Sequence, residues 1–179
     1  DPVQGLRQLV FDDVPDRYFM ARLNDAVDCE RLIRSAGSFD LKFFCPDPFA
    51  YAITDETFSV TEEGVHIITR TIGNIESLPV YRIEGVITAG ASNYINITTN
   101  GSELKIVNAT LSEGETLVVD TDKMTAYVVD ESGETLRNGL PYLQELNFPT
   151  LAVGENTVTV EVNNATLTEL QIGAKSRWR

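Results

Sequence analysis

The sequence predicts an all-β protein: an antiparallel β-sandwich preceded by a few strands of a second β unit. From residue 52 onward, short alternating runs of apolar and polar residues recur at spacings of about 8–12 residues, with turn signals between them. No stretch of residues 52–179 has the periodicity of an amphipathic helix. Before residue 52 the chain carries too few apolar side chains to form a domain alone, so we expect the tail end of a larger domain there.

The composition limits the classes of partner. A chain of 179 residues holds one ordinary domain plus a fragment, or two small domains. The formal net charge of −13 repels nucleic acid and anionic membranes, so we expect direct binding to neither. No apolar run reaches the roughly 18 residues that a membrane-spanning helix needs.

The N-terminal unit, residues 1–50, is expected to contain three or four strands. Residues 27–34 fit either a strand or a single helical turn, and Ser35–Ser38 closes that segment. The strands that we predict are Leu9–Phe11, Arg17–Leu23 and a continuous alternating strand over residues 39–45.

A Pro-Asp-Pro sequence then separates the two parts of the chain. Pro46 and Pro48 flank Asp47, and two prolines so close together end the preceding strand, because each fixes its own backbone angle and removes a hydrogen-bond donor. Phe49 and Tyr51 follow directly. We expect these five residues to form a stiff domain junction, with the two aromatic rings packed against the sandwich of residues 51–179.

The part of the chain after the junction is predicted to be a succession of strands. The clearest turn signal is Asn100-Gly101, which supplies the positive backbone angles of a type I′ hairpin. Two further hairpins are expected across Asp122-Lys123 and across Ser132-Gly133. The predicted strands are Thr57–Val60, Val65–Thr71, Leu78–Ile83, Tyr94–Thr99, Glu103–Val107, Leu117–Thr121, Thr125–Asp130, Glu134–Leu136, Thr157–Val162 and Thr166–Gly173.

Residues suited to catalysis are few, so we predict no enzyme. The single histidine, His66, lies in an alternating stretch where a solvent-facing strand position is expected. Asp120 and Asp122 could hold calcium or serve a glycosidase, but strand alternation or turn capping explains the pair more simply. Cys29 and Cys45 fit neither a disulfide scaffold nor a zinc site and are expected to be free, buried thiols. We expect no cofactor and no metal.

Two features of the sequence could involve saccharides, the first as glycosylation acceptors of a secreted eukaryotic protein and the second as tyrosines that stack on sugar rings. Asn-x-Ser/Thr sequences at Asn96, Asn100, Asn108 and Asn164 match glycosylation acceptors, although turn preference accounts for them. Tyr81, Tyr94, Tyr127 and Tyr142 could stack on sugar rings if exposed, with Tyr94 and Tyr142 as the candidates, although core or cross-strand packing is the simpler explanation for most.

Three segments and the C-terminus together resemble the distal tail protein family of siphophages and of prophages of Gram-positive bacteria. The match spans essentially the whole chain, and it depends on the combination because no single part is specific. The segments are Val14–Ala21, Gly37–Tyr51 and the pattern Asn147-Phe148-Pro149-Thr150-Leu151 followed by Gly154, Asn156, Thr157 and Val158, with Arg177-Trp178-Arg179 at the end.

The resemblance implies a domain order and a function. Members of the family have an N-terminal domain that assembles into a hexameric ring at the end of the tail, joined to an outward-facing, galectin-like or jelly-roll sandwich. By this resemblance residues 1–50 are the last strands of the ring domain, whose first part is expected to be absent here. The implied function is that of a non-catalytic hub in the tail tip of the virion, assembled in the cytoplasm of the bacterial host. Its implied partners are itself, the tail tube protein, and tail-associated or receptor-binding proteins.

The alternative function is a carbohydrate-binding sandwich that assists attachment to a saccharide of the host cell wall. Galectins hold galactosides with a His/Asn/Arg cluster and a stacking tryptophan, and no matching cluster is found in this sequence. A shared fold does not carry the function with it.

Overall fold

A computed structural model of the chain describes residues 5–24, 29–33 and 36–179. Contacts within the chain divide it into two compact units, of which the first comprises Asp1–Thr54 and Trp178–Arg179 and the second Asp55–Arg177. Among the described residues the only helical element is a short 3₁₀ helix, η1 (Leu140–Tyr142). The described part of the chain has no helix long and apolar enough to cross a membrane.

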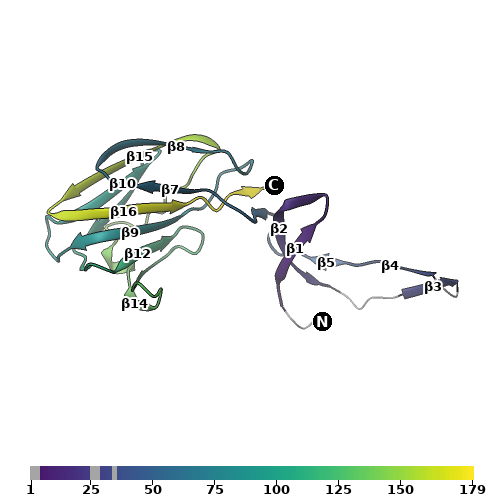
Figure 1. Cartoon of the computed structure of the whole chain (residues 1–179). Coiled ribbons are helices and arrows are strands. Elements are labelled where there is room, and N and C mark those ends of the chain that lie inside the picture. The colour runs from purple at the N-terminus through teal and green to yellow at the C-terminus, as the bar shows by residue number, and fades with distance from the viewer. Residues whose placement is uncertain (1–4, 25–28, 34–35) are drawn as a thin grey trace. The chain divides into compact units, whose positions relative to one another are not determined.

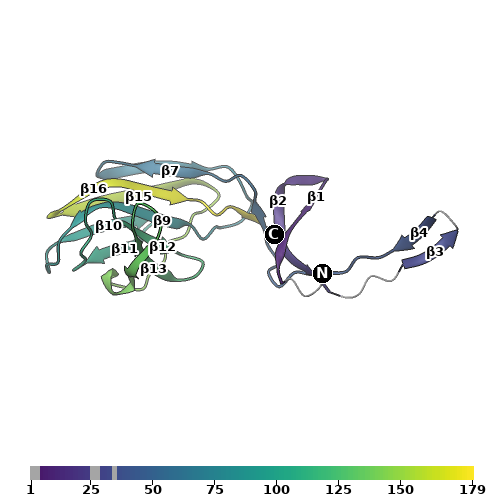
Figure 2. The ribbon, with the colours of Figure 1, turned by 60° about the horizontal axis from the view of Figure 1, so that its bottom comes forward.

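The first unit contains a small antiparallel sheet and a separate hairpin (Figure 2). The sheet has the order β1-β2-β6-β17, and β5 also pairs with β2. The hairpin consists of β3 and β4, which pair only with each other among the described strands. The bounds are β1 (Arg7–Phe11), β2 (Val14–Leu23), β3 (Cys29–Ile33), β4 (Ala36–Phe39), β5 (Phe43–Phe44), β6 (Ala50–Ala52) and β17 (Arg177–Trp178).

The predicted continuous strand over residues 39–45 is wrong. The stretch divides because its two ends pair with different strands: Phe39 lies opposite Cys29 in the hairpin, and Phe44 lies opposite Arg22 of β2. Phe43 and Phe44 are both exposed, so the alternation in the sequence does not bury one face. The ambiguous segment 27–34 forms strand β3 at Cys29–Ile33, and its remaining residues lie outside the described part. The expected closing segment Ser35–Ser38 lies largely in β4.

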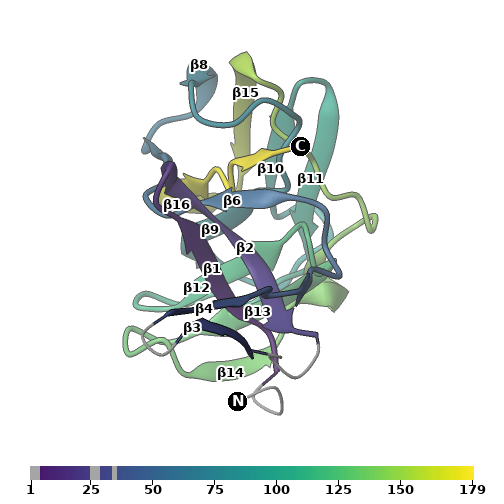
Figure 3. The ribbon, with the colours of Figure 1, turned by 90° about the vertical axis from the view of Figure 1, so that its right-hand side faces the viewer.

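The second unit is the predicted sandwich, and Figures 1 and 3 show its two layers. One sheet has the strand order β11-β10-β15-β8 and the other β14-β13-β12-β9-β16-β7. Neighbouring strands in both sheets pair antiparallel. The bounds are β7 (Thr57–Val60), β8 (Gly64–Arg70), β9 (Val80–Ile87), β10 (Tyr94–Thr99), β11 (Ser102–Val107), β12 (Thr116–Asp120), β13 (Thr125–Val129), β14 (Thr135–Asn138), β15 (Gly154–Asn163) and β16 (Ala165–Gly173).

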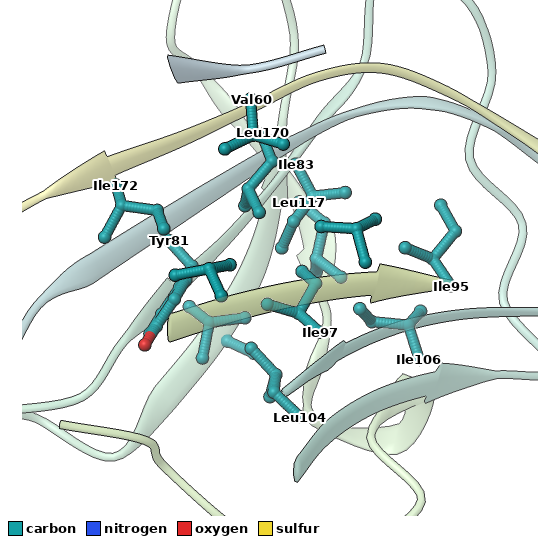
Figure 4. Packing of buried hydrophobic residues seen from close by; sticks show 14 of the residues in the cluster. Val60, Tyr81, Ile83, Ile95, Ile97, Leu104, Ile106, Leu117, Leu170 and Ile172 are labelled. Carbon is teal, nitrogen blue, oxygen red and sulfur yellow. The ribbon is translucent and has the colours of Figure 1, made fainter. Parts of the chain in front are cut away.

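The core lies between the two sheets, where the inward side chains of each strand meet those of the other layer (Figure 4). Ile97 and Leu104 come from the four-stranded sheet, Ile83 and Leu170 from the six-stranded sheet, and all four are 0% exposed. Tyr81 is also fully buried, as expected for a core tyrosine, and its hydroxyl donates to Thr99 Oγ1 at 3.1 Å. Burial of about 1.5–3 kcal/mol per large apolar side chain holds the two layers together.

Turn chemistry explains most of the Asn-x-Ser/Thr sequences. Asn100 and Gly101 have φ values of 51° and 84°, and Thr99 lies opposite Ser102, which confirms the type I′ hairpin between β10 and β11. Asn108 and Asn164 also have positive φ, at 49° and 48°, a conformation that asparagine tolerates better than most residues. Asn96 differs because it lies in β10 and is 7% exposed.

A buried arginine fixes the loops at one end of the sandwich. Arg70 is 0% exposed and donates from Nε to Ala152 O at 3.0 Å, from Nη1 to Ile72 O at 3.1 Å, and from Nη2 to Ile75 O. Burial lowers the pKa of Arg70, and nearby Asp55 opposes this shift. The guanidinium therefore donates hydrogen bonds to three loop carbonyls that have no hydrogen-bond partner in a neighbouring strand.

The same end of the sandwich is where the chain enters and leaves the unit. Ser176 N donates to Asp55 Oδ2 at 2.7 Å, which joins the exit segment to the entry segment. Glu56 accepts hydrogen bonds from the backbone N–H groups of Thr71 and Ile72. The entry segment is therefore tied directly to the loop after β8, and the exit segment is tied to the entry segment.

Candidate functional site

The predicted junction is a turn organised by one carboxylate. β5 ends at Phe44, and β6 begins at Ala50, so Pro46 and Pro48 lie between strands as expected. Asp47 Oδ1 accepts the N–H of Phe49 at 3.1 Å, and Oδ2 accepts the hydroxyl of Tyr51 at 2.5 Å. An aspartate that bonds the backbone two residues ahead stabilises a turn, so Asp47 adds its own constraint to those of the prolines.

Aromatic side chains of the first unit pack against residues of strand β2. The ring of Tyr51 lies 5.9 Å from that of Tyr18, which is its cross-strand neighbour in β2. The guanidinium of Arg17 lies 4.1 Å from the ring centroid of Trp178. Trp178 thus belongs to the first unit although it comes from the far end of the sequence. Packing of Phe49 and Tyr51 against the sandwich stays a prediction.

The two tyrosines predicted to stack on a sugar, Tyr94 and Tyr142, each contact a cationic side chain of the protein itself. Tyr94 is half-buried in β10, and the Lys105 ammonium lies 4.6 Å from its ring centroid. Tyr142 lies in η1, packs against the core, and its hydroxyl accepts a hydrogen bond from Arg137 Nε at 3.1 Å. They come from different parts of the fold, and neither lines the two clefts described next.

Two clefts lie on the outer face of the six-stranded sheet, the face turned away from the core. One has a volume of about 610 Å³ and the other about 350 Å³, and Arg82 of β9 lines both. The larger cleft is acidic, since Glu84, Glu113 and Glu131 line it. The smaller cleft contains a tyrosine, a glutamine, a buried aspartate and three cationic side chains.

The strand register explains why these side chains share one face. In the pairing of β9, β12 and β13, Val118 lies opposite both Arg82 and Tyr127. Gln171 of β16 lies opposite Arg82 on its other side. Residues directly opposite in neighbouring strands point to the same face, so these four form a row across the sheet.

Comparison with known proteins gives two findings. Residues 72–178 match the family model described as the siphovirus-type tail component, C-terminal domain. The chain belongs to this family. The solved structure titled "Crystal Structure of SPP1 Dit (gp 19.1) Protein, a Paradigm of Hub Adsorption Apparatus in Gram-positive Infecting Phages" is similar in fold, with a TM-score of 0.70 and 16% identity. The match covers 98% of this chain and 66% of that one, so the chain spans just under two thirds of its length. No curated protein matches.

The family and the fold confirm the resemblance to siphophage distal tail proteins and the all-β class. This tail component has no group of three or more His, Cys, Asp or Glu residues placed to hold a metal ion among its described residues. Asp120 caps the turn after β12, where its Oδ1 accepts the N–H of Lys123 at 3.1 Å, in agreement with the simpler explanation of this carboxylate. His66 is half-buried, and its Nε2 lies 2.9 Å from Glu62 O. A solvent-facing position is expected for this histidine, but the strand exposes its neighbours Val65 and Ile67 more fully, at 67% and 59%.

The prediction for the cysteines of the tail component is partly wrong. Cys45 is free, as expected, but it is exposed instead of buried. It follows directly after β5, a strand whose own side chains are exposed, so this part of the unit offers no core for it to enter. The side chain of Cys29 lies outside the described residues.

One ion pair involves a residue that lines the larger cleft, Glu115. Arg137 Nη1 and Nη2 donate to Glu115 Oε1 and Oε2 at 2.6 and 2.7 Å. The hydrogen bond from Arg137 holds the pKa of Glu115 below its ordinary value, although partial burial opposes this. Arg137 also donates to Thr110 O at 2.6 Å and to the Tyr142 hydroxyl, so it fastens β14 to the loop before β12 and to η1.

Replacement of Glu115 by Gln tests the stabilising role of this pair. Because the folded-state pKa of Glu115 lies below the unfolded one, its contribution is complete at pH 7 and is lost as the pH falls through the folded-state value. We expect Glu115→Gln to lower the free energy of unfolding by about 1 kcal/mol at pH 7, with a smaller difference from the native chain at pH 3. Urea denaturation at the two pH values measures this. Glu134→Gln is the matched control, and equal losses for the two variants at pH 7 would contradict the assignment.

Proposed function

We propose that the chain is a non-catalytic part of the hub at the tail tip of a siphophage, that is, a distal tail protein. The family match over residues 72–178 is the observation that carries this proposal. The similar solved structure is described as a hub of an adsorption apparatus, which agrees with it. In this role the protein joins the tail tube to tail-associated and receptor-binding proteins and is found at the tail tip of the virion after assembly in the bacterial cytoplasm.

The first unit has the properties of an assembly domain, and we assign residues 1–50 to the C-terminal part of the ring-forming domain. Several large apolar side chains are exposed there, which in a soluble protein marks surfaces that other chains cover. The hairpin of β3 and β4 has no third strand among the described residues, and an isolated hairpin is marginally stable in water. The exposed apolar residues are Leu6, Val10, Phe11, Phe39, Leu41, Phe43 and Phe44.

The mass of the full-length protein in solution tests this assignment. We expect a hexamer or a multiple of it, because a closed ring of copies covers the edges and apolar side chains that a monomer exposes. Light scattering coupled to size exclusion gives the mass directly. A monomer that carries an intact N-terminal domain would count against the ring.

The junction is proposed to set the relative orientation of the two domains, with residues 51–179 as the outward-facing sandwich. Pro46, Pro48 and the Asp47 turn leave few backbone angles free to vary just before β6, the strand of the first unit from which the chain continues into the sandwich. In the chain with Pro46→Ala and Pro48→Ala, small-angle X-ray scattering is expected to show a broader distribution of inter-domain distances. The urea midpoint of the sandwich should not change.

The matched control for this variant is Pro141→Ala, an exposed proline of the sandwich at the 3₁₀ helix. It removes the same ring without touching the junction. Scattering curves that superimpose for all three chains would overturn the proposed role of the junction.

A second candidate function is saccharide binding by the sandwich during host attachment. The observation that favours it is the smaller cleft, where Tyr127 lies beside amide, carboxylate and cationic side chains. Sugars are held by such a combination of an apolar ring face and convergent hydrogen-bonding groups. We therefore transfer the stacking role predicted for Tyr94 and Tyr142 to Tyr127.

A glycan array probed with the chain tests this second function. Binding that is weakened by Tyr127→Leu and kept by Tyr94→Leu supports the cleft, because leucine preserves apolar cover while it removes the ring face. An array without any signal above background contradicts saccharide binding, and the assembly function would be unaffected by that result.

A further inference from the structure

We infer that the smaller cleft selects acidic saccharides, whose pyranose rings carry a carboxylate, over neutral ones. The inference rests on the second proposed function and specifies its ligand. Three cationic side chains, Arg82, Lys123 and Lys175, line this cleft together with one carboxylate, Asp120. The protein as a whole carries a net charge of −13, so the cleft is a local excess of positive charge on an acidic molecule.

The single carboxylate of the cleft is already compensated. Asp120 is 7% exposed, and its Oδ2 accepts a hydrogen bond from Lys123 Nζ at 2.9 Å. Burial alone would raise the pKa of Asp120, but the hydrogen bonds from Lys123 outweigh it and the pKa is lowered. Asp120 is therefore an ionised group whose charge Lys123 balances.

Arg82 and Lys175 are left for an anionic ligand. Within the described part of the chain neither forms an ion pair or a side-chain hydrogen bond. Arg82 is exposed on β9, a middle strand of the six-stranded sheet, and Lys175 is exposed just after β16. A guanidinium matches the two oxygens of a carboxylate with a pair of parallel hydrogen bonds, which favours Arg82 as the direct contact.

The remaining residues of the cleft fit a ring with hydroxyl groups. The row Gln171, Arg82, Val118 and Tyr127 crosses four neighbouring strands, a span of about 14 Å at a strand spacing of roughly 4.8 Å. Val118 is 1% exposed although it points to the outer face, so its neighbours cover it and form a firm floor. Tyr127 offers an apolar ring surface, and Gln171 offers both a donor and an acceptor.

A glycine keeps the cleft open. Gly173 lines it, and its backbone does not require glycine, since its φ is outside the left-handed region. A Cβ atom at this position would meet only Val80 O, at 3.8 Å, which is ordinary contact. A side chain is therefore compatible with the strand, and its absence leaves space above the sheet.

The test compares two ligands that differ only in charge. The affinity of the whole chain for trigalacturonic acid and for its methyl ester is measured by isothermal titration. The ester has the same rings as the acid but no charged carboxylates. We expect the acid to bind about ten- to a hundredfold more tightly, the range expected for a charge-assisted hydrogen bond. High salt should weaken binding of the acid and leave that of the ester unchanged.

Three variants locate the effect. Arg82→Gln is expected to remove the preference for the acid, and Gly173→Val to block both ligands by filling the cleft. Lys105→Gln is the matched control, because it removes the same charge on the outer face of the opposite sheet. Thermal unfolding of each variant shows whether it is folded, and a folded Arg82→Gln chain that keeps the preference would overturn the inference.

The outcomes separate the inference from the function on which it rests. Equal affinity for the acid and the ester overturns the acidic preference and leaves saccharide binding in place. Absence of binding to the acid and to the ester overturns the acidic preference and saccharide binding together. Tighter binding of a glycerol phosphate oligomer than of trigalacturonic acid also overturns the inference, because that ligand supplies the negative charge without the pyranose ring.

Discussion

The burial of two apolar sheet faces against each other is the constraint on which the rest of this structure depends. Each strand of the sandwich has a period of two, so Tyr81 and Ile83 enter the core while Arg82 and Glu84 between them face outward. A shift of one residue in the register would place charges in the core. The core therefore determines which side chains meet on the outer face, although it contains none of them.

At the end of the sandwich where the chain enters and leaves, loops leave carbonyl groups without strand partners, and these carbonyls need other hydrogen-bond donors. Arg70 satisfies three of them from a fully buried position. Asp55 and Glu56 bind backbone N–H groups of Ser176 and Thr71 at the same end. The segments by which the chain enters and leaves the sandwich are thus bound to its framework.

Sequence reasoning succeeded where the signal is local. The Asn100-Gly101 hairpin, the alternating strands of the sandwich and the strand end before Pro46 depend on backbone preferences of a few residues, and all are found. It failed for residues 39–45, where alternation suggested one strand but β3 and β2 each pair with one end. Alternation records which residues could share a face, and it carries no information on the strand with which they pair.

The candidate site shows the same division. The sequence indicates Tyr94 and Tyr142 as stacking residues because they are aromatic, but Lys105 lies over the ring of Tyr94 and Arg137 donates to the hydroxyl of Tyr142. Arg82, Tyr127 and Gln171 carry no motif and are separated by long stretches of sequence, and only the register of β13, β12, β9 and β16 brings them to one cleft.

The sequence by itself determined that this chain is an all-β tail component with an antiparallel sandwich after a proline-containing turn, because strand periodicity, turn residues and family motifs are properties of neighbouring residues. Only the tertiary structure decided which side chains share an outer face and which charges are left without partners. Both depend on pairing between strands that are distant in the chain, and the free energy that selects this pairing comes from the common core.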